Sequence, residues 1–173
     1  MMGALTSAGT GWSKILGGKP DWQDNFRFDA EGANAGFIAY GVAVLIAIVL
    51  ASLRIGFPPP DVVLLLIAGH VMPLLTLLLV TAAAVRLAGA QGASARFLVP
   101  GLYLIALMKL IEGVAVLAGI NLAGAILAVT AILAFRLARA NGLALGWSIG
   151  YGIAFFVLLA GLPIALYMLV SAT

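Results

Sequence analysis

The chain contains five apolar runs separated by short polar or glycine- and proline-rich breaks. The runs cover Phe37–Leu53, Val62–Val85, Phe97–Gly119, Leu122–Phe135 and Trp147–Val170. A membrane-spanning helix needs about 20 mostly apolar residues. Only 9% of the 173 residues are charged and 64% are hydrophobic, whereas soluble domains carry about 25% charged residues. The sequence therefore predicts an all-α, polytopic transmembrane helix bundle with five spans.

The breaks between the runs favour turns. Phe57–Pro60 can end the first helix and Asp61 can cap the second, while Gly89–Ser94 forms a turn of small residues. The fourth run, Leu122–Phe135, is the shortest and reaches membrane length only with an interfacial end at Asn121 or Arg136. A re-entrant hairpin at this run, giving four spans, is the alternative.

Basic residues indicate the orientation of the chain. With five spans, one side holds seven of the nine Lys and Arg residues: Lys14, Lys19, Arg27, Arg86, Arg96, Arg136 and Arg139. Arg54 alone lies on the other side. The positive-inside rule then places the N-terminus in the cytoplasm and the C-terminus outside. We expect a multi-pass protein of the bacterial cytoplasmic (inner) membrane, with an untranslocated N-terminus because Met1–Gly11 lacks a secretory-signal pattern.

Residues 1–35 are predicted to form a cytoplasmic juxtamembrane segment, and residues 36–173 the five-helix transmembrane domain. The segment mixes aromatic residues with charges immediately before the first span, which is typical of chain lying on lipid headgroups. We expect its interfacial anchors to be Trp12, Trp22, Phe26 and Phe28.

Two opposite charges, Lys109 and Glu112, interrupt the third apolar run. A charged residue near the centre of a span costs about 2.5 to 3.5 kcal/mol on insertion scales. Residues three apart lie on one helix face, so the two side chains can neutralise each other. The only histidine, His70, lies in the second run, and a rise of about 1.5 Å per residue brings all three groups to one depth. We therefore predict an intramembrane polar cluster of His70, Lys109 and Glu112.

Pro73 supports this prediction, because it cannot donate a hydrogen bond to the carbonyl of Gly69 and so kinks the helix beside His70. Two interpretations stay open. The cluster is a proton relay, polar ligand site or metal site, or it is a polar contact that sets the register of two helices.

The last run carries the small-residue pattern Gly146-x-x-x-Gly150, continued by Ala154 on the same face. Such residues allow close helix packing in lipid, either within the bundle or between chains. With 21 glycines in the chain, the pattern is only moderately specific.

Catalytic motifs are missing from the sequence, and so are cysteines. We predict no enzymatic activity, no metal site and no cofactor, with a single-histidine haem or pigment bond at His70 as an alternative. The basic residues form no continuous stripe, so no nucleic acid is expected.

The layout resembles that of Yip-domain membrane proteins, in particular their small bacterial relatives. The resemblance rests on Asn25-Phe26-Arg27-Phe28-Asp29 running into Gly36-Phe37, five spans, and Phe135-Arg136-Leu137-Ala138-Arg139 leading into Gly142–Gly146. It implies a non-catalytic, partner-binding or membrane-organising role. Lys109 and Glu112 depart from the pattern expected of that family.

From the sequence we expect a non-catalytic accessory or scaffold protein that associates laterally with other membrane proteins or with itself in the lipid bilayer. The alternative is a proton- or ion-coupled transporter subunit that uses His70, Lys109 and Glu112.

Overall fold

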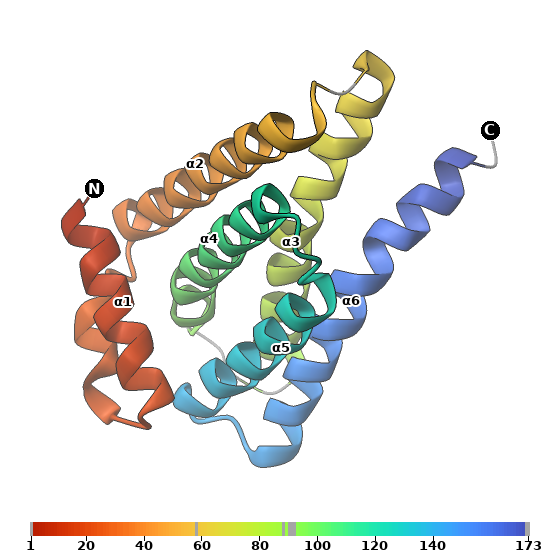
Figure 1. The fold of residues 1–173 in the computed structure, drawn as a ribbon. Coiled ribbons are helices and arrows are strands. Elements are labelled where there is room, and N and C mark those ends of the chain that lie inside the picture. The colour runs from red at the N-terminus through yellow and green to blue at the C-terminus, as the bar shows by residue number, and fades with distance from the viewer. Residues whose placement is uncertain (1, 58, 88, 90–92, 172–173) are drawn as a thin grey trace.

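A computed structural model describes residues 2–57, 59–87, 89 and 93–171. These residues are helical, without a β-strand among them. In chain order the elements are α1 (Met2–Leu16), the short 3-10 helix η1 (Pro20–Asn25), α2 (Ala30–Ile55), α3 (Pro60–Leu87), α4 (Ser94–Ala118), α5 (Ala123–Ala140) and α6 (Leu145–Ser171) (Figure 1).

Five of these helices, α2 to α6, are long and apolar enough to cross a membrane. This confirms the predicted all-α bundle with five candidate spans. The fourth, α5, is continuous over 18 residues, a length of about 27 Å. A re-entrant hairpin at this position is therefore wrong.

The first span is longer than its apolar run predicts. α2 has 26 residues and begins at Ala30, because the carboxylate of Asp29 accepts a hydrogen bond from the backbone N–H of Gly32 at 2.8 Å. A carboxylate at this position satisfies a free N–H of the first turn and favours the helix dipole. The predicted boundary after residue 35 therefore falls inside α2. The expected cap at Asp61 lies outside the described side chains.

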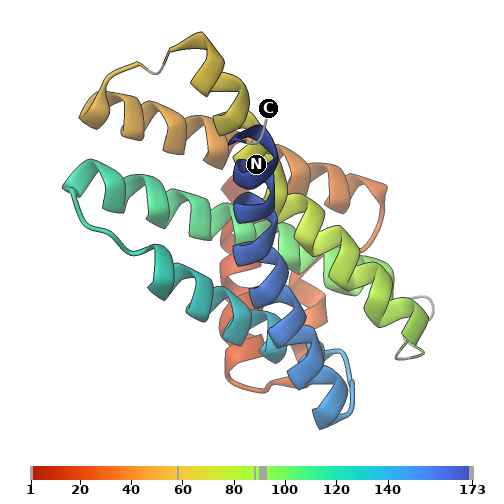
Figure 2. The ribbon, with the colours of Figure 1, turned by 90° about the vertical axis from the view of Figure 1, so that its right-hand side faces the viewer.

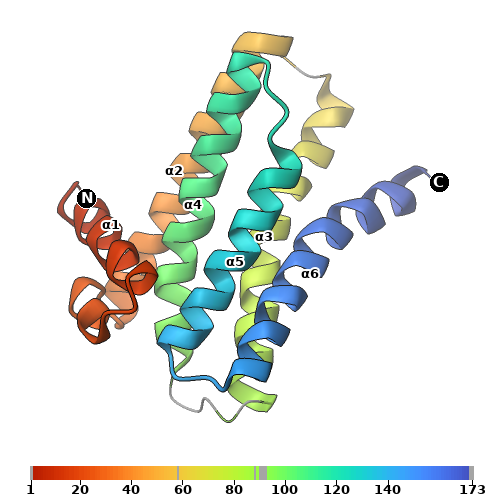
Figure 3. The ribbon, with the colours of Figure 1, turned by 60° about the horizontal axis from the view of Figure 1, so that its bottom comes forward.

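Helices α2 and α4 form the closest helix pair of the bundle and run parallel. A Cβ atom at Gly113 would lie 2.7 Å from the Cα of Ala47, and one at Gly36 would lie 2.9 Å from the Leu102 side chain. Small residues let two helices approach closely in lipid, where hydrophobic burial cannot drive their association. Figure 3 shows the two helices side by side.

Helices α5 and α6 pack as an antiparallel hairpin, and α3 lies against both α4 and α6. Viewed from the side of α6, that helix runs along the front of the bundle (Figure 2). The largest fully buried side chains of the central core are Phe97, Phe155, Leu77, Leu102 and Ile105. The C-terminal part of α6 leans away from α2 and α4 (Figure 3).

The N-terminal segment is folded, and its helix α1 packs against α4 and α5. Ala8, Trp12 and Ile15 form an apolar stripe at helical spacing, and two of them are almost fully buried. The guanidinium of Arg136 in α5 donates a hydrogen bond to the carbonyl of Leu16, the last residue of α1. A cation at this position also favours the C-terminal end of the helix dipole.

Three of the long helices contain an internal proline: Pro73 in α3, Pro100 in α4 and Pro163 in α6. Each deprives the carbonyl four residues earlier of its helical donor. In α4 that carbonyl belongs to Arg96, and the side-chain amide of Asn141 donates to it at 3.2 Å. The turn between α5 and α6 is thus tied to the start of α4.

Candidate functional site

Lys109 and Glu112 form an ion pair on α4, with Nζ of Lys109 2.7 Å from Oε2 of Glu112. The Lys109 side chain is 13% exposed, whereas the Glu112 side chain is 42% exposed. The lysine thus lies inside the bundle as predicted. The carboxylate is neutralised by it but keeps an accessible side.

His70 lies on α3, and its Nδ1 atom is buried without a hydrogen-bond partner in the described part of the chain. No hydrogen bond joins the imidazole to Lys109 or Glu112 among the described residues. The imidazole is thus not hydrogen-bonded to the ion pair within this part of the chain, and both sequence interpretations stay predictions. The backbone of the same residue is anchored, because the hydroxyl of Tyr40 in α2 donates to the His70 carbonyl.

A cavity of about 460 Å³ brings the predicted residues together. All five long helices contribute to its wall, and the predicted members on it are His70, Lys109, Glu112, Gly69 and Pro73. The rest of the wall is mostly apolar. A volume of this size falls in the range of about 300 to 1,000 Å³ seen for small-molecule sites. His70, Lys109 and Glu112 thus share the wall of one cavity.

Two helices with an internal proline contribute to the wall of this cavity. Pro73 leaves the carbonyl of Gly69 without its helical N–H donor, and Pro163 does the same to Leu159. All four residues line the cavity. The loss of the helical donor to the Gly69 carbonyl was predicted from the sequence, but the contribution of α6 to the cavity was not. The sequence signal for α6 is Pro163 within an apolar run, the same kind of signal as Pro73.

A second hollow of about 260 Å³ lies where α4 turns into α5, along Gly119–Ala123. Four residues line both hollows: Glu112, Val116, Ala123 and Ile126. Glu112 is the charged residue among them. Its carboxylate therefore lies where the cavity that holds His70 and Lys109 adjoins a hollow at the end of the bundle.

The polar groups on the cavity wall are mainly hydrogen-bond acceptors. They comprise the Glu112 carboxylate and the two carbonyls released by prolines, while the single ammonium, Lys109, is already paired. The neutral imidazole of His70 adds one acceptor nitrogen and one donor. Thr130 also lines the cavity, but its hydroxyl donates to the Ile126 carbonyl of its own helix at 2.6 Å. Such a wall favours a proton or a cation over an anion.

Two of the four predicted interfacial anchors are buried in the protein. Trp22 is 2% exposed and Phe26 is 8% exposed, and both pack in a cluster with Ile15, Val99 and Leu137. The prediction that they lie in lipid headgroups is wrong, because the N-terminal segment folds back on α4 and α5. Trp12 and Phe28 are partly buried against the same cluster.

The two glycines of the small-residue face of α6 make no close contact within the described part of the chain. A Cβ atom at Gly146 or Gly150 would meet no atom within 4 Å, whereas Ala154 packs against the central core. The close contact to α5 is made by Gly152, whose Cβ would lie 3.1 Å from the Ala131 carbonyl oxygen. The glycine of α6 that packs closely inside the bundle is therefore Gly152, two residues after Gly150 of the predicted motif.

Among the described residues, His, Asp and Glu side chains form no group of three or more that could hold a metal ion. Comparison with known proteins adds no homologue, since no protein family, curated protein or solved structure matches the chain.

Proposed function

We propose that this chain is a non-catalytic, multi-pass membrane protein that takes up a proton or a small cation at the Glu112 carboxylate. One observation carries the proposal: Glu112 lines both the cavity with His70 and Lys109 and the hollow at the α4–α5 turn. An ionisable residue within a membrane span is usually functional, because its burial is costly.

The acceptor groups on the wall support a cationic occupant. Lys109 balances the charge of Glu112 when the site is empty, so an incoming proton or cation competes with the ammonium for the carboxylate. His70, with its unpartnered buried Nδ1 atom, provides a second proton acceptor on the same wall. These are the features of the proton- or ion-coupled subunit considered from the sequence.

The proposed topology places this hollow on the non-cytoplasmic side of a bacterial inner membrane. The basic residues at the other end of the bundle, Arg86, Arg96, Arg136 and Arg139 among them, support this orientation. A reporter fused to the C-terminus is expected to show that this end lies outside. A cytoplasmic C-terminus would reverse the assignment of the hollow.

The proposal is tested with the purified chain in liposomes that contain a pH-sensitive dye and are driven by an imposed membrane potential. Wild-type protein should move protons or exchange them for Na⁺ or K⁺, Glu112→Gln should abolish this flux, and His70→Gln should reduce it. Thr76→Val is the matched control, since Thr76 is a buried polar residue in α3 that does not line the cavity.

Wild-type flux equal to that of protein-free liposomes would contradict transport by this chain alone. Infrared difference spectroscopy then asks whether the Glu112 carboxyl band, identified by its loss in Glu112→Gln, responds to pH or cations. A band that responds to neither would leave the ion pair with a structural role only.

Lateral association, the first expectation from the sequence, remains a second candidate function. The open face at Gly146 and Gly150 favours it, because nothing in the described chain covers these two residues. The chain has no cysteine, so Gly150→Cys introduces a single cross-linking site. A disulfide-linked dimer in native membranes, with Gly41→Cys on the exposed side of α2 as control, would support self-association.

A further inference from the structure

A second large cavity lies between the N-terminal segment and the α2–α4 pair, outside the site described above. Its volume is about 470 Å³. One wall is the first two turns of α1, the opposite wall is α2 and α4, and the link from η1 to α2 closes the end. Its lining includes Leu5, Phe26, Arg27, Glu31, Ile38 and Tyr103.

The cavity has a charged end and an apolar end. Arg27 lies in the link before α2 and Glu31 in its first turn, whereas Ile38 lies seven residues after Glu31, about 10 Å further along the helix axis. The rings of Phe26 and Tyr103, with centroids 6.2 Å apart, contribute to the wall between them. This gradient, from charge at the beginning of a span to apolar wall along it, matches the gradient through one leaflet of a bilayer.

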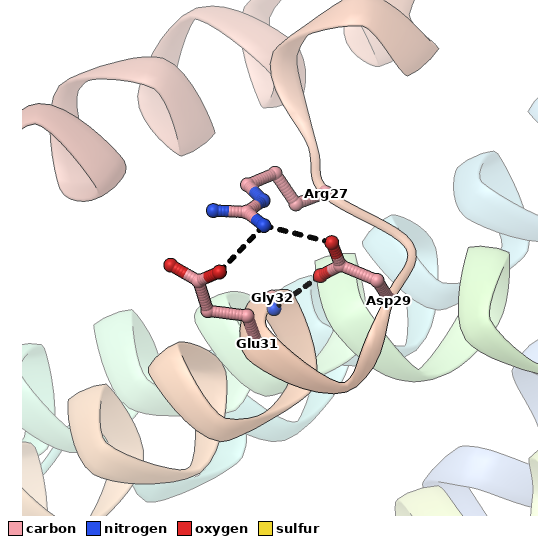
Figure 4. Close-up of polar contacts among 4 residues, drawn as sticks. All are labelled: Arg27, Asp29, Glu31 and Gly32. Atoms are coloured by element: carbon pink, nitrogen blue, oxygen red, sulfur yellow. Dashed lines mark hydrogen bonds and ion pairs between the residues drawn. The ribbon is translucent and has the colours of Figure 1, made fainter.

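At the charged end of the cavity, the lining residues Arg27 and Glu31 belong to a triad of ion pairs with Asp29, which is not itself a lining residue. Nη2 of Arg27 donates to Oδ2 of Asp29 at 2.8 Å and to Oε2 of Glu31 at 2.6 Å, while Oδ1 of Asp29 accepts from the Gly32 N–H (Figure 4). Both ion pairs use the same nitrogen, and within the described part of the chain Nε and Nη1 have no hydrogen-bond partner, so they can donate to another acceptor. One guanidinium against two carboxylates leaves a formal charge of −1. The three side chains are between 54% and 74% exposed.

The opposite wall is held in place by a contact between segments. The hydroxyl of Ser7 in α1 donates to the carbonyl of Asn25 at 2.8 Å, and both residues line the cavity. The cavity is therefore bounded by hydrogen-bonded structure on its α1 side and by the closely packed α2–α4 pair on the other.

We infer that this cavity binds a phospholipid with a primary ammonium headgroup, of the phosphatidylethanolamine class. The lipid phosphate accepts hydrogen bonds from the N–H groups of Arg27, and the ammonium donates to the carboxylate of Glu31, the acidic residue that lines the cavity. One acyl chain lies along the apolar wall towards Ile38. The net negative charge of the triad disfavours a purely anionic headgroup, and a quaternary choline cannot donate hydrogen bonds to the Glu31 carboxylate.

The inference is tested by native mass spectrometry of the full-length protein, delipidated in mild detergent and offered equal amounts of phosphatidylethanolamine, phosphatidylglycerol and phosphatidylcholine. We expect one phosphatidylethanolamine to be retained in preference to the other two. Glu31→Gln should lower its affinity by about tenfold, the usual effect of losing a charge-assisted hydrogen bond. Arg27→Gln should also lower it. Arg86→Gln, which removes an exposed arginine outside the cavity, should leave it unchanged.

Ile38→Trp fills the apolar end and should abolish retention without touching the charges. If that variant does not fold, Ala35→Leu on the same wall replaces it. Equal retention of all three lipids, retention unaffected by both filling variants, or a co-purifying polypeptide on this face would overturn the inference. Because Glu112 is not part of this cavity, failure here is distinguishable from failure of the proposed proton or cation site.

Discussion

The indole Nε1 of Trp12 in α1 donates a hydrogen bond to the backbone carbonyl of Pro100 in α4, at 3.1 Å. This contact joins residues 88 positions apart and connects the N-terminal segment to the third span. Together with the bond from Arg136 to the Leu16 carbonyl, it makes the segment part of the folded bundle.

Trp12→Phe is expected to weaken the docking of α1, because the ring keeps its apolar contacts but the carbonyl of Pro100 loses its donor. The cost should be about 1 kcal/mol. Hydrogen exchange over residues 2–16 should rise in this variant. Trp147→Phe, at a tryptophan that is 50% exposed, serves as control, and equal exchange in both variants would contradict the proposed anchoring.

Gly113→Ala is expected to destabilise the bundle by about 1 to 3 kcal/mol, since the new Cβ would overlap the Ala47 backbone and push α2 from α4. Gly41→Ala in α2 is the matched control, because a Cβ at that position meets nothing within 4 Å. It should be neutral or stabilising by up to about 1 kcal/mol. Thermal unfolding in detergent measures both, and similar melting temperatures for the two variants would argue against close α2–α4 packing.

Single substitutions of the intramembrane ion pair should differ from the double substitution. Glu112→Gln leaves the well-buried Lys109 ammonium without its partner and should cost about 1 to 3 kcal/mol, less than a fully buried pair because Glu112 is 42% exposed. Lys109→Met combined with Glu112→Gln removes both charges and should recover most of that loss. A double-mutant cycle on unfolding free energies checks this, and additive losses would show that the two side chains are not coupled.

Acid should loosen the N-terminal segment. The hydrogen bond from Lys14 lowers the pKa of Asp21, and the Gly32 N–H, followed by Arg27, lowers the pKa of Asp29, both from an ordinary value of 3.8. A carboxyl whose pKa is lower in the folded state stabilises that state above its unfolded pKa. The stabilisation is therefore complete above pH 3.8 and lost as the pH falls through the lower folded values.

The emission of Trp12 and Trp22 in a Trp147→Phe background should report this loosening as a shift below pH 3.8. Asp29→Asn should weaken the packing already at neutral pH. Asp24→Asn, at an exposed residue that forms no ion pair within the described part of the chain, should not. A tryptophan signal that is constant down to the lowest pH would contradict the role of the two carboxylates.

Much of the candidate site followed from local sequence pattern. Lys109 and Glu112 are three residues apart, and helix geometry alone brings their side chains to one face, where they pair at 2.7 Å. Counting about 1.5 Å per residue from the helix ends predicts that His70 lies at the same depth as this pair, and the three residues line one cavity.

The rotation of each helix about its axis and its bending could not be predicted from local sequence spacing. His70 lines the cavity but does not hydrogen-bond the ion pair, and Tyr40 binds its carbonyl instead. Pro163 joins the wall because α6 lies against α3 and α5. Whether two groups at equal depth meet depends on the angular position of each helix, and packing against neighbours far away in the sequence sets that angle.

The N-terminal segment shows the same division. Its mixture of aromatic and charged residues predicted a location at the surface of the membrane. The acidic residues Asp29 and Glu31 are a local signal for the start of a helix. The burial of Trp22 against Val99 and Leu137 has no local signal, because these residues are far away in the sequence.

By itself the sequence determined five apolar helices and the pairing of Lys109 with Glu112, since hydropathy and helical spacing act over a few turns. Only the tertiary structure decided that Glu112 adjoins two hollows and that the aromatic segment faces protein, because both depend on contacts between distant helices.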